Sequence, residues 1–150
     1  MENLLEINTK TCFLKGIDKS TCKIVNGIEE KTVKMSLKKF LNYNCEYYGS
    51  SFEGRKQSSK RLLGMKYKLP IVIEESREMV FFPTTSSESN NCIWISLNNI
   101  SSYEEKDFST VVTFNTGQIE KFDISMESFE NQVLRASKLL LILKNRKQSK

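Results

Sequence analysis

Histidine is absent from the 150 residues of this chain. Its absence excludes Ser-His and Cys-His nucleophiles, the usual general acid or base of enzymes, and every zinc site that needs an imidazole ligand. Proline occurs only at Pro70 and Pro83, and no segment has the composition of a linker. We therefore expect residues 1–150 to form one domain.

Long hydrophobic runs are absent as well. The longest is residues 139–143, far shorter than the roughly 18 residues of a membrane span. The N-terminus lacks the basic-then-apolar layout of a secretion signal, so we expect a cytoplasmic protein with no membrane partner. With 39% hydrophobic and 27% charged residues, the chain has the composition of a globular protein, not a disordered one.

The four cysteines have no spacing that indicates chemistry. Cys12, Cys22, Cys45 and Cys92 are separated by 10, 23 and 47 positions, whereas zinc knuckles and redox dithiols need gaps of a few residues. We expect them to be small buried apolar side chains. No metal, cofactor or small-molecule substrate is expected.

Charge is strongly segregated along the chain, although its net value is only +5. Residues 54–73 hold six basic and no acidic side chains, and residues 131–150 also hold six basic and no acidic ones. The intervening residues 74–130 hold 3 basic and 11 acidic side chains. Each basic block alone is compatible with a solvated loop or helix end, but the two together favour nucleic acid as the partner.

The hydrophobic pattern predicts a mixed α+β fold, with antiparallel β-hairpins in a sheet or half-barrel, a mid-chain helix and a long C-terminal helix. Ser36 is placed to cap a helix over 37–48, and residues 51–64 are compatible with a short polar helix. The expected hairpins pair 71–73 with 79–82 and 110–114 with 118–124. Shorter strands are expected around Leu5/Ile7, Cys12/Leu14, Cys22/Ile24, 92–96 and 100–103, with turns at 16–18 and 26–27.

The predicted C-terminal helix covers residues 126–145 and is capped by Ser125. One apolar stripe runs along it, while Leu134 and Leu141 lie on a second face. A helix docked on one sheet needs only the first stripe. The second face therefore indicates either a deeply buried helix or a self-association surface at Leu134 and Leu141.

Several sequence islands resemble the ComK family of bacterial competence transcription factors. The resemblance covers roughly residues 20–140, and its islands stand in the same order as in the family. They are 45–56 (CEYYGSSFEGRK), 79–87 (MVFFPTTSS), 92–96 (CIWIS), 113–117 (TFNTG) and 128–136 (SFENQVLRA).

The resemblance implies a transcriptional activator of DNA-uptake genes. Members of this family bind paired AT-rich boxes of double-stranded DNA, mainly through the minor groove, as homo-oligomers. Longer members carry a further C-terminal tail that serves oligomer activation and recognition by a proteolytic adaptor. This chain stops soon after the C-terminal helix, so both of those properties are open for it.

The residues are compatible with such binding, because reading a narrow AT-rich minor groove requires cations on a permissive backbone near small hydroxyl side chains. Residues 49–51 and 54–56 supply that combination. The candidate DNA contacts are Ser50, Ser51, Gly54, Arg55, Lys56, Lys60, Arg61, Thr84, Thr85 and Arg135.

Simpler roles compete at these positions. Glycine and serine at 49–54 are equally suited to capping helices, Thr84 and Thr85 belong to a stretch typical of turns, and Trp94 is expected in the core. Asn131 and Arg135, one helical turn apart, are placed either to contact DNA or to pin the helix to a loop. Two other functions remain alternatives: a metal-dependent nuclease, and an interaction module that keeps the fold without promoter activity.

Overall fold

A six-stranded antiparallel sheet forms the centre of the structure, a computed structural model that describes residues 6–86 and 89–148. Its strand order is β3-β2-β1-β6-β5-β4, and a second, three-stranded sheet has the order β7-β8-β9. The strands of the large sheet are β1 (Phe13–Asp18), β2 (Thr21–Asn26), β3 (Glu29–Val33), β4 (Ile71–Glu74), β5 (Met79–Pro83) and β6 (Ile93–Ser96). The other elements are α1 (Leu37–Tyr47), α2 (Phe52–Leu63), η1 (Leu97–Asn99), β7 (Ile100–Lys106), β8 (Ser109–Phe114), β9 (Ile119–Phe122) and α3 (Met126–Gln148).

Both faces of the large sheet are buried, because successive side chains of a strand point to opposite faces. Leu14 and Trp94 belong to a core cluster that includes the inner face of α1. Their neighbours Phe13 and Ile95 belong to a second cluster, which includes the small sheet and Phe129 of α3. The molecule thus has a helical layer on one side of the large sheet, and the small sheet with α3 on the other.

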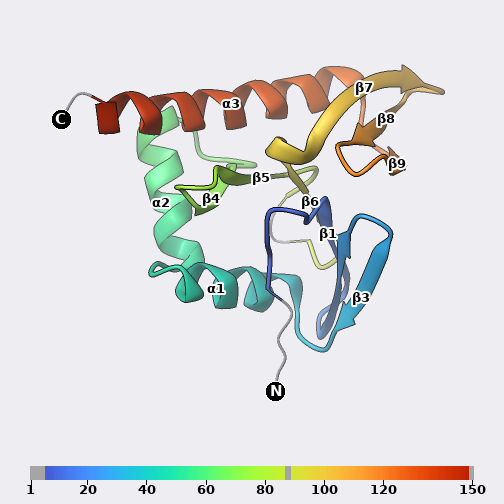
Figure 1. Cartoon of the computed structure of the whole chain (residues 1–150), viewed down its shortest axis with the longest axis horizontal. Coiled ribbons are helices and arrows are strands. Elements are labelled where there is room, and N and C mark those ends of the chain that lie inside the picture. The colour runs from blue at the N-terminus through green and yellow to red at the C-terminus, as the bar shows by residue number, and fades with distance from the viewer. Residues whose placement is uncertain (1–5, 87–88, 149–150) are drawn as a thin grey trace.

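Figure 1 shows how the helices frame these sheets. The long helix α3 runs along one edge of the molecule and α1 along the opposite edge. Helix α2 crosses between them at one end, so its C-terminal part lies beside the C-terminal half of α3. The expected mixed α+β fold, with its mid-chain and C-terminal helices, is confirmed.

Predictions that rest on local signals are largely confirmed. Helices form over all three predicted segments, and α3 continues beyond the predicted end to Gln148. The Oγ atom of Ser36 accepts from the Lys39 N–H at 3.2 Å, and that of Ser125 accepts from the Ser128 N–H at 3.1 Å. Both expected hairpins form as well, as β4–β5 and β8–β9.

The cysteines and the tryptophan also take the predicted places. All four cysteines are free and buried, and Trp94 is 1% exposed. Burial raises the pKa of Cys22 and of Cys45 to about 11, so both remain protonated thiols at neutral pH.

Two local expectations are wrong, and one strand was missed. Ile7 lies outside the strands because α1 side chains bind its backbone: Asn44 Oδ1 accepts from its N–H and the Tyr48 hydroxyl donates to its carbonyl. Its expected partner in that strand, Leu5, lies outside the described residues. The turn expected at 16–18 falls at 19–20, because β1 continues to Asp18. Gly16 serves close packing in this strand, since a Cβ there would stand 2.0 Å from the Asn90 carbonyl oxygen. The mostly exposed edge strand β3 was not predicted.

Candidate nucleic-acid interface

The two basic blocks of the sequence meet in a groove between α2 and α3. From α2, Arg55, Ser58, Ser59, Arg61 and Leu62 line it; from α3, Leu139, Leu143 and Arg146; and from the β4–β5 hairpin, Val72 and Glu75. The cavity has a volume of about 300 Å³. We call it the α2–α3 groove. Three arginines that are up to 91 positions apart in the sequence therefore share one cavity.

Packing of α3 on the large sheet creates this groove. Phe129, Ala136 and Leu139 are buried in the second core cluster, which fixes the side of α3 that faces the sheet. Helix α2 begins at the Ser51 cap, whose Oγ accepts from the Gly54 N–H at 2.9 Å, and it ends at Gly64, which has a φ of +68°. The groove is therefore bounded by two helices whose ends are fixed.

The candidate residues of 50–61 do not all face this groove. Arg55 is half-buried in it, and among the described residues its buried Nε atom has no hydrogen-bond partner. Arg61 lines it as well, and the exposed Lys60 precedes Arg61 on the same helix. Lys56 is turned toward the first turn of its own helix: its Nζ lies 3.8 Å from the Glu53 carboxylate and 5.2 Å from the centroid of the Phe52 ring.

The permissive backbone expected here is present only in part. Gly49 follows α1 with a φ of +89°, so it matches the expectation. Gly54, however, lies in the first turn of α2, and Ser51 is the cap of that helix. Because Arg55 and Lys56 project from a helix, they do not sit on a slim flexible segment as expected.

Thr84 and Thr85 differ in their surroundings. Thr84 is 7% exposed, and its hydroxyl donates to the Ile93 carbonyl at 3.1 Å, so its side chain is committed to the sheet and does not fit the expected DNA contact. Thr85 is exposed. Ser87, from the same polar stretch, lies outside the described residues.

Arg135 lies in a second groove, between α3 and the loop that follows α2. Its lining residues are Met65, Lys66, Tyr67 and Lys68 from the loop, and Ser128, Asn131, Gln132 and Arg135 from α3. This cavity has a volume of about 390 Å³, and we call it the loop groove. Its lining contains three cations and no acid.

Gln132 of α3 holds this loop in place by hydrogen bonds, although the sequence did not single it out. Its Nε2 donates to the Lys68 carbonyl at 3.0 Å and to the Pro83 carbonyl at 2.7 Å, and its Oε1 accepts from Arg135 Nη1 at 2.9 Å. Lys66, Tyr67, Lys68 and Arg146 were likewise missing from the candidates. All four lie within the basic blocks and three of them are cations, but only the tertiary contact shows which cations share a groove.

Acidic side chains of the β4–β5 turn fix the end of α3. Lys144 Nζ lies 2.6 Å from a Glu78 carboxylate oxygen, and Lys147 Nζ lies 2.8 Å from one of Glu75. Glu75, the acidic residue that lines the α2–α3 groove, is therefore already paired. The groove keeps its electropositive character because its arginines outnumber this neutralised acid.

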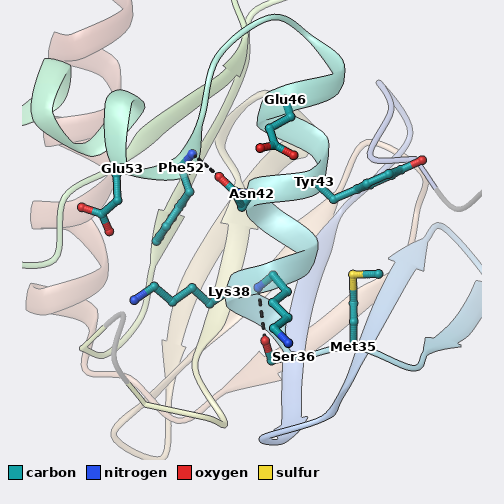
Figure 2. A pocket seen from close by; sticks show the side chains of 9 residues that line it. Met35, Ser36, Lys38, Asn42, Tyr43, Glu46, Phe52 and Glu53 are labelled. Atoms are coloured by element: carbon teal, nitrogen blue, oxygen red, sulfur yellow. Dashed lines mark hydrogen bonds between the residues drawn. The ribbon is translucent and has the colours of Figure 1, made fainter.

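A third pocket, of about 540 Å³, has a different character (Figure 2). It lies on the outer face of α1 and the start of α2, where Met35, Tyr43 and Phe52 supply apolar surface. Lys38 and Lys39 are balanced there by Glu46 and Glu53. Because its charges cancel, this pocket lacks the potential that a nucleic acid requires.

Across 6–86 and 89–148, no three or more Cys, Asp or Glu side chains are grouped so that they could hold a metal ion. None of the described helices is long and apolar enough to cross a membrane.

Comparison with known proteins identifies relatives. Residues 2–148 match the family model of the ComK protein. The competence transcription factor of Bacillus subtilis (strain 168) is 35% identical over 120 residues, which cover 77% of this chain and 62% of that protein. The chain thus spans less than two thirds of that relative's length. No solved structure matches significantly.

The turn that holds the end of α3 yields a pH prediction. Hydrogen bonds from the Ser76 hydroxyl and from Arg77 lower the pKa of Glu74 from 4.5 to about 2. A carboxylate with a lowered pKa stabilises the fold above its unfolded-state pKa, and this contribution disappears as the pH falls through the folded-state value. Denaturant unfolding should therefore show a Glu74-dependent loss of stability between about pH 4.5 and pH 2.

We expect Glu74→Gln to lower the free energy of unfolding at pH 7 by roughly 1–2 kcal/mol and to flatten this part of the pH profile. Glu104→Gln, on an exposed position of β7, is the control and should leave the profile unchanged. Equal profiles for the wild type and Glu74→Gln would contradict the prediction.

Proposed function

The chain belongs to the ComK family, and from that membership and the two cationic grooves we propose that it is a competence transcription factor that binds double-stranded DNA. The proposal includes recognition of paired AT-rich boxes through the minor groove by a homo-oligomer. The chain then acts in the cytoplasm, where a bacterial chromosome lies. The observation that supports DNA binding most directly is the meeting of both basic blocks along one side of α3.

The spacing of the groove residues fits an extended polyanion. Ser128, Gln132, Arg135, Leu139, Leu143 and Arg146 recur every three or four positions, so they form one stripe along α3. From Ser128 to Arg146 this stripe is ~27 Å long at 1.5 Å per residue. Phosphates follow one another every ~3.4 Å along a strand. Gln132 and Leu139 are buried, so the polar members of the stripe that can reach phosphates are Ser128, Arg135 and Arg146. Each groove supplies three cations for these contacts.

Binding without catalysis suits this set of side chains. Arginine and lysine supply charge and hydrogen-bond donors to phosphate oxygens, but they offer no general base at neutral pH. The acid that lines the α2–α3 groove, Glu75, is held by Lys147. We therefore assign the grooves to DNA binding and do not propose the nuclease.

Self-association is assigned to the other side of α3. Leu134 and Leu141 are 66% and 58% exposed, so the alternative of a deeply buried helix is excluded. In an antiparallel α3–α3 contact, Leu134 of one copy meets Leu141 of the other, which covers both exposed leucines at once.

Removing groove charges tests the proposed surface. We expect Arg61→Gln with Arg146→Gln to weaken binding to an AT-rich duplex roughly tenfold or more, and to reduce the slope of log K against log salt by about 1–2, since each lost phosphate contact removes about one unit. Fluorescence anisotropy on the folded variant measures both quantities.

The matched control is Lys31→Gln, which removes an exposed cation from edge strand β3. Its affinity should equal that of the wild type. Equal affinity for all three proteins would overturn the groove assignment. Absence of binding to any duplex by the wild type would instead favour the interaction module.

Competition distinguishes the two grooves of DNA. The minor groove of AT tracts is narrow and strongly negative, so we expect a minor-groove ligand such as netropsin to displace the protein, whereas a major-groove dye does not. A GC-rich duplex of equal length should bind more weakly at the same salt concentration. Binding that is insensitive to netropsin would contradict minor-groove recognition.

Charge on the second face of α3 should prevent assembly. Leu134→Glu with Leu141→Glu places like charges opposite each other in the α3–α3 contact, so we expect sedimentation equilibrium to show monomers where the wild type forms dimers or larger species. Ile28→Glu, at a 96% exposed position in the β2–β3 turn, is the control and should assemble like the wild type. A wild-type monomer would contradict this assignment.

A further inference from the structure

The loop between α2 and β4 holds an aromatic side chain out into solvent among cations. Tyr67 is 81% exposed, and Lys66 and Lys68 flank it in the sequence. The ring lines the loop groove together with Arg135 of α3. The Tyr67 ring therefore offers an exposed aromatic surface next to three cations.

The backbone of this loop is held in a conformation that it would not adopt alone. Lys68 has a φ of +52°, in the left-handed region that is unfavourable for a non-glycine residue. Its carbonyl accepts from Gln132 Nε2, and Gln132 is only 2% exposed. The same amide group binds the Pro83 carbonyl and the Arg135 guanidinium.

Gln132 thus fixes three parts relative to one another: the loop, the end of β5 and the arginine of the loop groove. A buried amide with both ends engaged is a rigid support, since breaking any of its hydrogen bonds leaves a buried polar group without a partner. Tyr67 and Arg135 are therefore presented together from a fixed base.

Dimensions decide which part of this surface can enter a minor groove. An α-helix with its side chains is about 10–12 Å across, whereas the minor groove of B-DNA is about 6 Å wide. Helices α2 and α3 therefore lie across the sugar–phosphate rims and do not enter the groove. A single loop with one projecting ring is slim enough to enter it.

We infer that residues 64–69 form the element that enters the minor groove, with the Tyr67 ring packed against the sugars and base edges of the groove and Gln132 as the positioning residue of the loop. This inference rests on the proposed DNA-binding function. Lys66, Lys68 and Arg135 contact the phosphates on either rim. The ring supplies shape recognition of a narrow groove, whereas the arginines of the α2–α3 groove supply charge.

The test compares AT-rich and GC-rich duplexes of equal length, by anisotropy with the full chain. We expect Tyr67→Ala to lower affinity for the AT-rich duplex roughly tenfold, to reduce the AT/GC affinity ratio, and to leave the salt slope unchanged because the ring carries no charge. Tyr67→Phe keeps the ring and should retain the wild-type ratio. A Phe variant that behaves like the Ala variant would overturn the packing assignment.

Phe108→Ala is the matched control. Phe108 is 90% exposed and lies at the tight β7–β8 turn, where Asp107 and Phe108 both have positive φ, so it too is an aromatic side chain on a strained turn. Its removal should change neither affinity nor ratio. A loss equal to that of Tyr67→Ala would overturn the inference.

Gln132→Ala tests whether Gln132 positions the Tyr67 loop. The AT/GC affinity ratio does not depend on the fraction of folded protein, so loss of stability alone would leave this ratio unchanged. We expect the ratio to fall in Gln132→Ala, and to fall no further in the double variant with Tyr67→Ala. If Tyr67 and Gln132 variants keep the wild-type ratio while Arg61→Gln with Arg146→Gln loses affinity, the loop inference fails and the proposed function stands. If the wild type binds no duplex, both fail.

Discussion

The burial of α3 against the large sheet is the constraint on which both grooves depend. Phe129 is fully buried, with its ring centroid 5.6 Å from that of Phe82 and 4.9 Å from that of Tyr103. Each apolar side chain of this size contributes about 1.5–3 kcal/mol when it is buried. The half-exposed ion pairs at the end of α3 contribute about 0–1 kcal/mol each. Apolar packing therefore sets the position of α3, and the ion pairs orient its last turns.

The packing of α3 on the large sheet brings three positively charged side chains into one groove. Arg55, Arg61 and Arg146 share a cavity of about 300 Å³, and their mutual repulsion opposes folding. The half-buried Arg55, with a buried Nε that has no hydrogen-bond partner among the described residues, adds a cost of desolvation. Glu75 is the acid in the lining of this groove, and it is paired with Lys147. An anionic partner removes both costs at once, which is the physical reason to regard the groove as a binding surface.

Local signals account for what the sequence predicted correctly. The caps Ser36 and Ser125 act on backbone groups within three residues, so the start of each helix is encoded where it forms. The irregular backbone at Ile7 depends on Asn44, 37 positions away, and no local pattern indicates it. Strand β3 was missed because four of its five residues are exposed, which gives no apolar alternation.

In the candidate site, too, local features were predicted from the sequence and features that depend on distant contacts were not. Both basic blocks were visible as composition, but the loop groove joins Lys68 to Gln132, which are 64 positions apart. Gln132 reads as an ordinary surface amide until the fold buries it. Thr84 shows the converse, because its hydroxyl lies in a polar stretch of the sequence but donates to the Ile93 carbonyl of the sheet. Residue type indicated the partner, whereas the position of each contact depends on tertiary packing.

The two proposals about α3 are geometrically compatible. Leu134 and Leu141 lie on the side of the helix away from its buried stripe, whereas both grooves lie along an edge of that stripe. An antiparallel α3–α3 contact therefore leaves the grooves uncovered and relates the two copies by a two-fold axis. Such an axis presents two Tyr67 loops to DNA at a fixed separation. A pair of short AT-rich boxes is the target that a two-fold pair of groove-reading loops would select, since each loop can read only a few base pairs.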